Sequence, residues 1–181
     1  MKFWILLFSP LIFLSCNNST FEMMQFEKHD FTLVKVNIKD LTQKSVIISY
    51  DPECPVCLLY GNSMEYLSKT YSDFKFILVL SSGSDTALFK EKLTHFNHYT
   101  IFYDPENKFL KKIGTTTTPQ TFVFSKDKTL MYNGAFDNRV KSLGSKSLFA
   151  DSFYLKNAIV LLQQNKKPTI KKTQPIGCLI Q

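Results

Sequence analysis

The sequence lacks the features that mark several common classes of protein. Its longest mainly apolar run, residues 3–14, is shorter than the roughly 20 residues that a membrane-spanning helix needs, and no other segment is apolar over such a length. No internal repeat is present. The lysines are not interleaved with aromatic residues in any nucleic-acid-binding module, so no nucleic-acid partner is expected. Leu58 stands where a haem-attachment motif requires histidine, which argues against covalently bound haem.

The first 16 residues have the layout of a secretory signal. Lys2 supplies a positive start, an apolar run follows, and a small residue precedes Cys16. Leu14-Ser15-Cys16 resembles the lipobox of bacterial lipoproteins, which implies that residues 1–15 are a cleaved signal peptide and that Cys16 carries a diacylglycerol. An ordinary secretory signal, or an uncleaved one, is the alternative. The net charge of +7 would also favour an anionic membrane surface.

The rest of the chain alternates between short apolar segments and segments of helical periodicity. Strands are expected at residues 31–36, 45–50, 74–80, 99–103, 120–124 and 129–132, and helices at residues 55–71, 85–96, 106–113 and 149–164. The β-α-β-α-β-β-α order predicts a single α/β domain, a mixed sheet with helices on both faces. We expect a tether at residues 16–30, the domain at residues 31–165 and a C-terminal tail with Cys178 at residues 166–181.

Cys54 and Cys57 form a C-x-x-C motif where a buried strand is expected to end and a helix to begin. Unpaired backbone N–H groups and the helix dipole stabilise an anion there, so Cys54 is expected to be an exposed thiol with a lowered pKa. Pro55 suits the first helical turn, where its missing N–H costs nothing. Cys57 lies one turn deeper and is expected to be buried. The predicted cycle is attack by Cys54 on a substrate disulfide, followed by resolution by Cys57.

The apolar strand, the C-P-V-C motif, the helix and the downstream Thr118-Pro119 pair together resemble the thioredoxin superfamily. The resemblance implies a thioredoxin-like fold in which Pro119 is a cis proline beside Cys54. It also implies that Thr118 and Pro119 help to bind an extended substrate. An ordinary trans proline that opens a strand is the alternative.

Further segments resemble one group within this superfamily, the redoxins related to alkyl hydroperoxide reductase and thiol-specific antioxidant proteins. These segments are Glu53-Cys54-Pro55 with Tyr60, residues 132–139, residues 154–159, and the C-terminal set of Lys167, Pro168, Thr173, Pro175 and residues 177–180. Together they cover most of residues 45–181. The resemblance implies activity on thiols and disulfides.

Two features distinguish the sequence from other members of this group. A peroxiredoxin has threonine three residues before its peroxidatic cysteine, where this chain has Asp51, so a thiol peroxidase of the peroxiredoxin type is the second choice. The second cysteine of the C-x-x-C motif is often absent from redoxins, and its presence here as Cys57 favours dithiol-disulfide exchange.

Cys178 has two interpretations. If Cys16 carries a lipid, three cysteines remain, so at least one is free or pairs outside the chain. Cys178 is then either a solvent-facing thiol on a flexible tail or a third redox thiol that exchanges with Cys54 or with another protein.

We therefore predict a lipid-anchored enzyme of the bacterial cell envelope, facing the periplasm or the exterior, that exchanges thiols and disulfides. Its expected partners are protein or small-molecule thiols and disulfides, a redox partner that recycles the site, and the membrane. No cofactor and no metal is expected. The direction of exchange stays open, and a structural disulfide is one alternative. Another alternative is a copper-binding module, with ligands from Cys54, Cys57, Cys178 and either His95 or His98.

Overall fold

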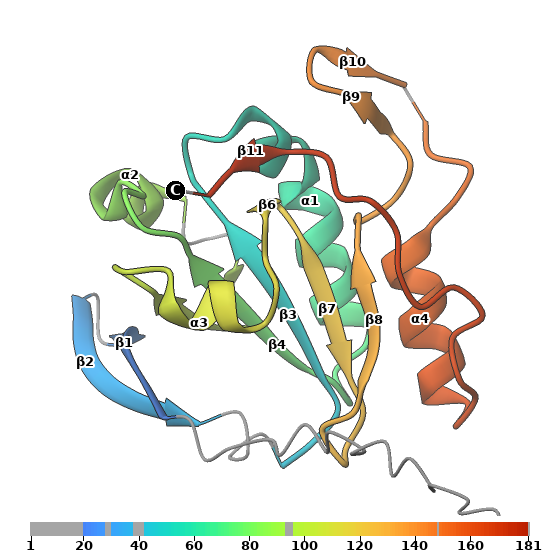
Figure 1. The fold of residues 1–181 in the computed structure, drawn as a ribbon, viewed down its shortest axis with the longest axis horizontal. Helices are drawn as coiled ribbons and strands as arrows, with labels where there is room; N and C mark the ends of the chain where they lie inside the picture. Colours follow the sequence, from blue (N-terminus) through green and yellow to red (C-terminus); the bar gives the residue numbers. More distant parts are fainter. Residues whose placement is uncertain (1–19, 28–29, 38–41, 93–95, 148, 181) are drawn as a thin grey trace, which may run out of the picture.

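The computed structural model describes residues 20–27, 30–37, 42–92, 96–147 and 149–180. Its centre is a seven-stranded mixed sheet with the order β2-β1-β5-β4-β3-β7-β8 (Figure 1). The strands of this sheet are β1 (Thr20–Glu27), β2 (Asp30–Asn37), β3 (Ser45–Tyr50), β4 (Lys75–Leu80), β5 (Tyr99–Tyr103), β7 (Thr121–Phe124) and β8 (Leu130–Gly134). The helices are α1 (Pro55–Thr70), α2 (Thr86–Glu91), α3 (Lys108–Lys112) and α4 (Tyr154–Gln163). Two small sheets pair β9 (Val140–Ser142) with β10 (Ser145–Lys146), and β6 (Thr117–Thr118) with β11 (Cys178–Leu179).

The central strands are buried because both faces of the sheet are covered. β3 and β4 pair in parallel, as do β4 and β5, whereas β7 runs antiparallel to β3. All six residues of β3 are buried, and its side chains alternate between two cores. Val46 and Ile48 pack in the core that includes residues of α1 and α4, and Ile47 packs in the core that includes residues of α3 and β1. The predicted mixed sheet with helices on both faces is confirmed.

Residues 20–27, inside the predicted tether, form β1 instead. β1 pairs with β2 along its whole length and with β5 at Met24 and Gln25, antiparallel in both cases. Met23 is only 1% exposed because it packs in the same core as Phe109 of α3, and this burial draws the segment into the sheet. The predicted signal peptide and Cys16 lie outside the described residues.

The helix predicted at residues 85–96 is shorter in the structure. Asp85 caps α2, because its carboxylate accepts hydrogen bonds from the backbone N–H groups of Ala87 and Leu88, each at 2.9 Å. α2 ends at Glu91, and Phe96 lies beyond it as a buried core residue. In the described part of the chain, no helix combines the length and the apolar character needed to cross a membrane.

The C-terminal tail, predicted as a separate segment, packs against β8. The Thr173 backbone N–H donates to the carbonyl of Asn133, whose own N–H donates to the carbonyl of Lys171. The Thr173 hydroxyl lies 2.6 Å from the hydroxyl of Tyr132. This close packing requires Gly134, whose φ is +146°, because a Cβ at this position would lie 2.3 Å from Oγ1 of Thr173. The tail is therefore fixed to the sheet at Thr173.

Gly134→Ala tests this attachment. We expect the free energy of unfolding to fall by about 2 to 4 kcal/mol, because the substitution combines an unfavourable φ with an overlap against Thr173. The tail should also become sensitive to limited proteolysis. Gly114→Ala is the control, because its φ is +85° but nothing lies within 4 Å of the added Cβ. That variant should lose only about 1 kcal/mol in urea unfolding and keep its tail protected, and equal losses in the two variants would contradict the attachment.

Candidate functional site

Cys54 lies at the N-terminus of α1, just after β3 ends. The Cys54 backbone N–H donates to the carbonyl of Asp51 at 3.2 Å, which closes the turn between the strand and the helix. Cys54 is the N-cap residue with extended dihedral angles, and Pro55 occupies the first helical position. The Cys54 sulfur therefore lies at the end of α1 that carries unpaired backbone N–H groups.

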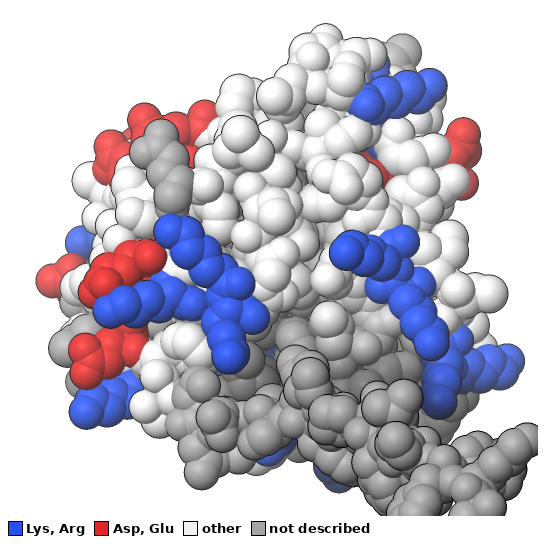
Figure 2. Space-filling model, viewed as in Figure 1, with Lys and Arg blue, Asp and Glu red and all other residues white. Residues whose placement is uncertain are grey.

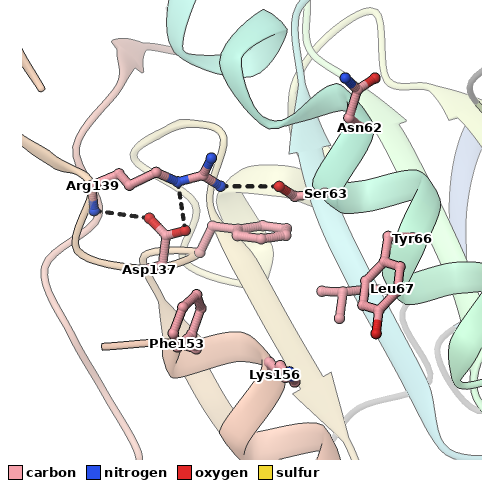
Figure 3. A pocket seen from close by; sticks show the side chains of 9 residues that line it. Asn62, Ser63, Tyr66, Leu67, Asp137, Arg139, Phe153 and Lys156 are labelled. Carbon is pink, nitrogen blue, oxygen red and sulfur yellow. Dashed lines mark hydrogen bonds and ion pairs between the residues drawn. The ribbon is translucent and has the colours of Figure 1, made fainter. Parts of the chain in front are cut away.

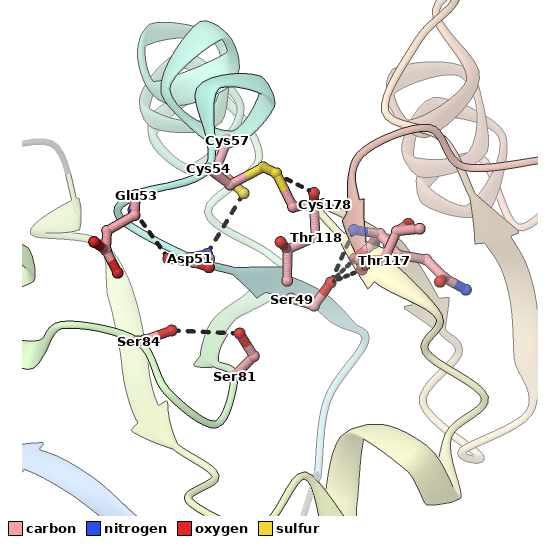
Figure 4. Close-up of a disulfide and its surroundings, with 11 residues drawn as sticks. Ser49, Asp51, Glu53, Cys54, Cys57, Ser81, Ser84, Thr117, Thr118 and Cys178 are labelled. Atoms are coloured by element: carbon pink, nitrogen blue, oxygen red, sulfur yellow. Dashed lines mark hydrogen bonds between the residues drawn. A yellow bond between two sulfur atoms is a disulfide. The ribbon is translucent and has the colours of Figure 1, made fainter. Parts of the chain in front are cut away.

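The structure pairs Cys54 with Cys178. The predicted cycle pairs Cys54 with Cys57, and the observed bond matches the alternative in which Cys178 is a third redox thiol that exchanges with Cys54. The two Cα atoms are 6.0 Å apart, and the disulfide joins positions separated by 124 residues. Figure 4 shows this bond between the start of α1 and the tail. Cys54 is only 2% exposed, which corrects the prediction of an exposed thiol. Cys178 is half-buried and bonded, so in this structure it is not a solvent-facing thiol on a loose tail.

Cys57 is fully buried and is the free thiol among the described cysteines. The backbone N–H of Asp51 donates to its sulfur at 3.5 Å. Burial raises the pKa of Cys57 to about 12, with a smaller contribution from the negative charge of Asp51, while hydrogen bonds from the Asp51 backbone and the Thr118 side chain act in the opposite direction. At neutral pH Cys57 is therefore a protonated thiol and a weak nucleophile.

The predicted cis bond between Thr118 and Pro119 is confirmed. The Thr118 carbonyl oxygen lies 3.3 Å from the Cys54 sulfur, so the loop that carries this bond borders the disulfide. Thr118 and Pro119 are both buried in the structure. The backbone of Thr118 and the sulfur of Cys54 thus form one continuous site, although the two residues are far apart in the sequence.

Two buried polar residues hold this loop in place. The Ser49 hydroxyl donates to the carbonyl of Thr117 at 2.8 Å and accepts from the N–H of Gln120 at 2.9 Å. The Gln120 side-chain oxygen accepts from the N–H of Thr116 at 2.9 Å. Neither Ser49 nor Gln120 is predicted as a site residue. A serine inside the apolar run at residues 45–50 could have indicated a buried hydroxyl that needs hydrogen-bond partners. They fix the backbone that faces Cys54.

Tyr60 connects α1 to the segment that follows β8. Its hydroxyl donates to Asp137 Oδ1 at 2.6 Å, and the buried Asp137 carboxylate pairs with Nε of Arg139 at 2.9 Å. Arg139 also donates to the Ser63 hydroxyl at 3.0 Å, and its guanidinium lies over the Tyr60 ring. Burial raises the pKa of Tyr60, and its hydrogen bond to Asp137 adds to this effect. These contacts give the Tyr60 and 132–139 motifs a shared role, which is to hold α1 against the sheet.

A pocket of about 250 Å³ lies beside this network, between α1 and α4 (Figure 3). Asp137 and Arg139 line it, together with Leu67 and Phe153. Ser63, also in its wall, follows Cys54 by nine residues, which is roughly 13 Å along a helix. The pocket is therefore separate from the disulfide.

The copper alternative requires a set of metal ligands. Within the described ranges, no group of three or more histidine, cysteine, aspartate or glutamate side chains is placed to hold a metal ion. Cys54 and Cys178 are bonded to each other, and His98 is exposed. His95 lies outside the described residues. The described part of the chain thus offers no preformed ligand set.

Comparison with known proteins assigns this chain to a family. The family model described as Redoxin matches residues 17–146. A search of curated protein sequences finds no match. An uncharacterized conserved protein from Geobacillus kaustophilus has a TM-score of 0.74 at 18% identity, with 91% of this chain and 89% of that chain covered.

Two solved structures with descriptive names have lower similarity. The exposed lipoprotein thioredoxin of Streptococcus pneumoniae has a TM-score of 0.51 at 20% identity, covering 64% of this chain and 87% of that chain. A secreted disulfide oxidoreductase of Mycobacterium tuberculosis has a TM-score of 0.51 at 14% identity, covering 61% and 79%. At these identities the structural matches establish the fold.

The family match covers most of the chain, including Cys54, Cys57 and the Thr118-Pro119 bond, and ends before Cys178. The fold, the C-x-x-C position at a helix N-terminus and the adjacent cis proline all agree with this match. The chain therefore belongs to the redoxin family of thiol oxidoreductases and has a thioredoxin-like α/β fold.

Proposed function

We propose that this redoxin is a thiol-disulfide oxidoreductase in which Cys54 is the attacking thiol. The observation that carries the proposal is the disulfide between Cys54 and Cys178 at the N-terminus of α1, next to the backbone of Thr118. A helix N-terminus stabilises a thiolate, and the thiolate is the form of cysteine that attacks a disulfide. Cys57 lies inside the helix and Cys178 in the tail, so neither has this placement.

The proposed reaction transfers two electrons through the Cys54 sulfur. The Cys54 thiolate attacks one sulfur of a substrate disulfide, and the other substrate sulfur leaves as a thiolate that takes up a proton. A second thiol of the chain then attacks Cys54 in the mixed disulfide and releases the remaining substrate sulfur as a thiol. The substrate ends as two thiols and the protein as a disulfide. A redox partner with a dithiol resets the site, and the reverse sequence oxidises a substrate.

Two cysteines compete for the second attack. Cys178 is bonded to Cys54 in the structure, so we assign to it the step that forms this disulfide. Cys57 is one helical turn from Cys54 and provides a second route through the C-P-V-C motif. This route is slower at neutral pH, because burial keeps Cys57 protonated.

A thiol peroxidase is the second candidate, and the position of Cys178 favours it. A peroxide would oxidise the Cys54 thiolate to a sulfenic acid, releasing the reduced peroxide oxygen as water or an alcohol. Condensation of this sulfenic acid with the Cys178 thiol would release water and leave the same disulfide. Asp51 stands where the peroxiredoxin threonine is expected, and its carboxylate accepts a hydrogen bond from the Glu53 backbone at 2.9 Å. Disulfide exchange therefore remains the first choice.

We also propose that the protein acts in the bacterial cell envelope while attached to a membrane through a lipid on Cys16. The signal-like residues 1–15 support this location, and one of the structurally similar proteins is named a lipoprotein. Stable disulfides are typical of such oxidising compartments. The partners would be thiols or disulfides of other envelope molecules, together with the redox partner that recycles the site.

Serine substitutions separate the roles of the three cysteines in exchange with oxidised glutathione. Cys54→Ser should abolish exchange, because among the described cysteines Cys54 is the one at the N-cap position of α1. Cys178→Ser should keep the first attack but lengthen the lifetime of the mixed disulfide, which mass spectrometry would detect. Cys57→Ser is the matched control and should still form the disulfide between Cys54 and Cys178. Retained exchange in Cys54→Ser would refute the assignment of the nucleophile.

The raised pKa of Cys57 predicts unusual alkylation kinetics. In the oxidised protein carrying Cys16→Ser, Cys57 should react with iodoacetamide at pH 8 about a thousandfold more slowly than a thiol of the ordinary pKa of 9.0. The rate should rise about tenfold per pH unit until the pH approaches 12, because the thiolate fraction rises in this way below the pKa. The urea-unfolded protein is the control and should react at the ordinary rate. A native rate that levels off near pH 9 would contradict the burial of this thiol.

The lipid anchor is tested by labelling cells with a radioactive fatty acid. Cys16→Ser should eliminate the label and move the protein out of the membrane fraction, because the attachment sulfur is gone. Cys54→Ser is the control and should keep both the label and the membrane location. Continued labelling of Cys16→Ser would rule out this anchor.

A further inference from the structure

The tail strand β11 lies on the backbone edge beside Cys54. β11 pairs with β6 in antiparallel register, with Cys178 opposite Thr118. The Ile180 N–H continues the pairing by donating to the carbonyl of Thr116 at 3.2 Å. The tail is thus held by backbone hydrogen bonds as an added strand, which is how extended peptides bind to exposed sheet edges.

The edge of β6 needs such a partner. Ser49 and Gln120 hold the other side of the loop through hydrogen bonds that do not involve the tail. If β11 leaves, the backbone groups that pair with it lose their partners, and unpaired backbone groups are costly when they are not hydrated. An extended segment of compatible shape on this edge would restore those hydrogen bonds.

A segment that pairs with β6 can have no side chain at the residue directly before its cysteine. A Cβ on Gly177 would lie 2.1 Å from the Thr118 carbonyl oxygen and 3.2 Å from the Pro119 nitrogen. Both are backbone atoms of the loop that Ser49 anchors, so no side-chain rotation relieves the overlap. After the cysteine the restriction ends, because the Leu179 side chain is 79% exposed.

The surroundings of β11 are suited to an uncharged segment. The described residues that form the surface over β6 and β11 are uncharged in Figure 2, and the charged side chains gather away from them. Ile180 is half-buried and packs against the core that contains Ile47. An apolar residue two positions after the cysteine can therefore pack against this core.

We infer that residues 177–180 occupy the place of an extended peptide substrate within the chain. The inferred substrate class is an extended, uncharged peptide segment in which glycine directly precedes the reactive cysteine. This inference rests on the proposed function, since it concerns the partners of the Cys54 thiol. The Cys54 thiolate attacks the cysteine sulfur of a peptide disulfide, the other sulfur leaves as a thiolate that takes a proton, and the peptide stays bonded along β6.

The tail and the substrate exclude each other, because both need the Cys54 sulfur and the same edge of β6. Thr173 is fixed to β8, and only four residues separate it from Cys178. This short arm keeps the Cys178 thiol at a high effective concentration near Cys54. The tail can therefore expel a reacted peptide and return to its place.

Peptide probes test the inferred substrate class on the protein with Cys16→Ser, Cys57→Ser, Gly177→Ala and Cys178→Ser, in which Cys54 is the remaining cysteine and the alanine displaces β11 from β6. The first probe copies residues 173–181, with its cysteine in a mixed disulfide with glutathione. The second replaces the glycine before the cysteine with alanine, and the third replaces the leucine after it with alanine. The alanine-for-glycine probe should form the adduct with Cys54 about tenfold or more slowly, because its methyl group overlaps the loop. The leucine replacement should change the rate by less than about twofold, because that side chain faces solvent.

The outcomes separate this inference from the proposed function. Oxidised glutathione alone measures whether Cys54 exchanges with any disulfide. Equal rates for the glycine and alanine probes, with normal exchange by glutathione, would overturn the substrate class and leave the proposed function standing. A Cys54 that reacts with neither glutathione nor the probes would overturn the proposed function itself.

A substitution in the chain gives an independent measurement. In the protein with Cys16→Ser, Gly177→Ala should lower the equilibrium constant for forming the Cys54 to Cys178 disulfide from oxidised glutathione by about tenfold or more, because it pushes β11 off β6. Gly61→Ala is the matched control, because nothing lies within 4 Å of a Cβ added there, and it should leave the constant unchanged. An unchanged constant in Gly177→Ala would overturn the close approach on which the inference depends.

Discussion

The backbone edge of β6 is the constraint on which the geometry of the site depends. It places the Thr118 carbonyl 3.3 Å from the Cys54 sulfur and provides the hydrogen-bonding groups that hold β11. A cysteine in a chain that pairs with β6 has its backbone aligned by these hydrogen bonds, and its sulfur then lies beside the Cys54 sulfur. The site is thus selective for extended chains, and in this structure the C-terminal tail occupies it.

Two sets of polar contacts keep this arrangement rigid from opposite sides. Ser49 and Gln120 fix the loop around β6, and their hydrogen bonds are buried, where an unpaired group would be costly. Tyr60, Asp137 and Arg139 fix α1, which carries Cys54. The disulfide then joins two parts that are already positioned, so the Cys54 and Cys178 sulfurs can meet with little rearrangement of the domain.

Much of the fold follows from local sequence patterns, and the proximity of Thr118 to Cys54 follows from family resemblance. The apolar run at residues 45–50 predicts a strand buried on both faces, and the motif after it predicts a helix with Cys54 at its start. The choice between Cys57 and Cys178 as the partner of Cys54 could not be made in this way. Pairing with Cys178 depends on where Thr173 fixes the tail, and that contact is made by residues far apart in the chain.

Two segments of the fold differ from what the sequence predicts. The sequence predicts a tether at residues 16–30 because a polar stretch follows Cys16, yet Met23 is buried against a core to which α3 contributes. The hairpin of β9 and β10 is also not predicted, because it is short and its residues are mostly exposed. Tertiary packing places β1 in the sheet, and no local periodicity reports it. The hairpin is instead formed by the pairing of β9 with β10.

The central claim is that the oxidised site joins Cys54 to Cys178 and leaves Cys57 as a thiol. Mass spectrometry of peptides released from the oxidised protein by proteolysis, without reduction, tests it most directly. The predicted result is one cross-linked pair containing Cys54 and Cys178, with Cys57 alkylated only after unfolding. A cross-link between Cys54 and Cys57, with Cys178 freely alkylated in the folded protein, would contradict this account.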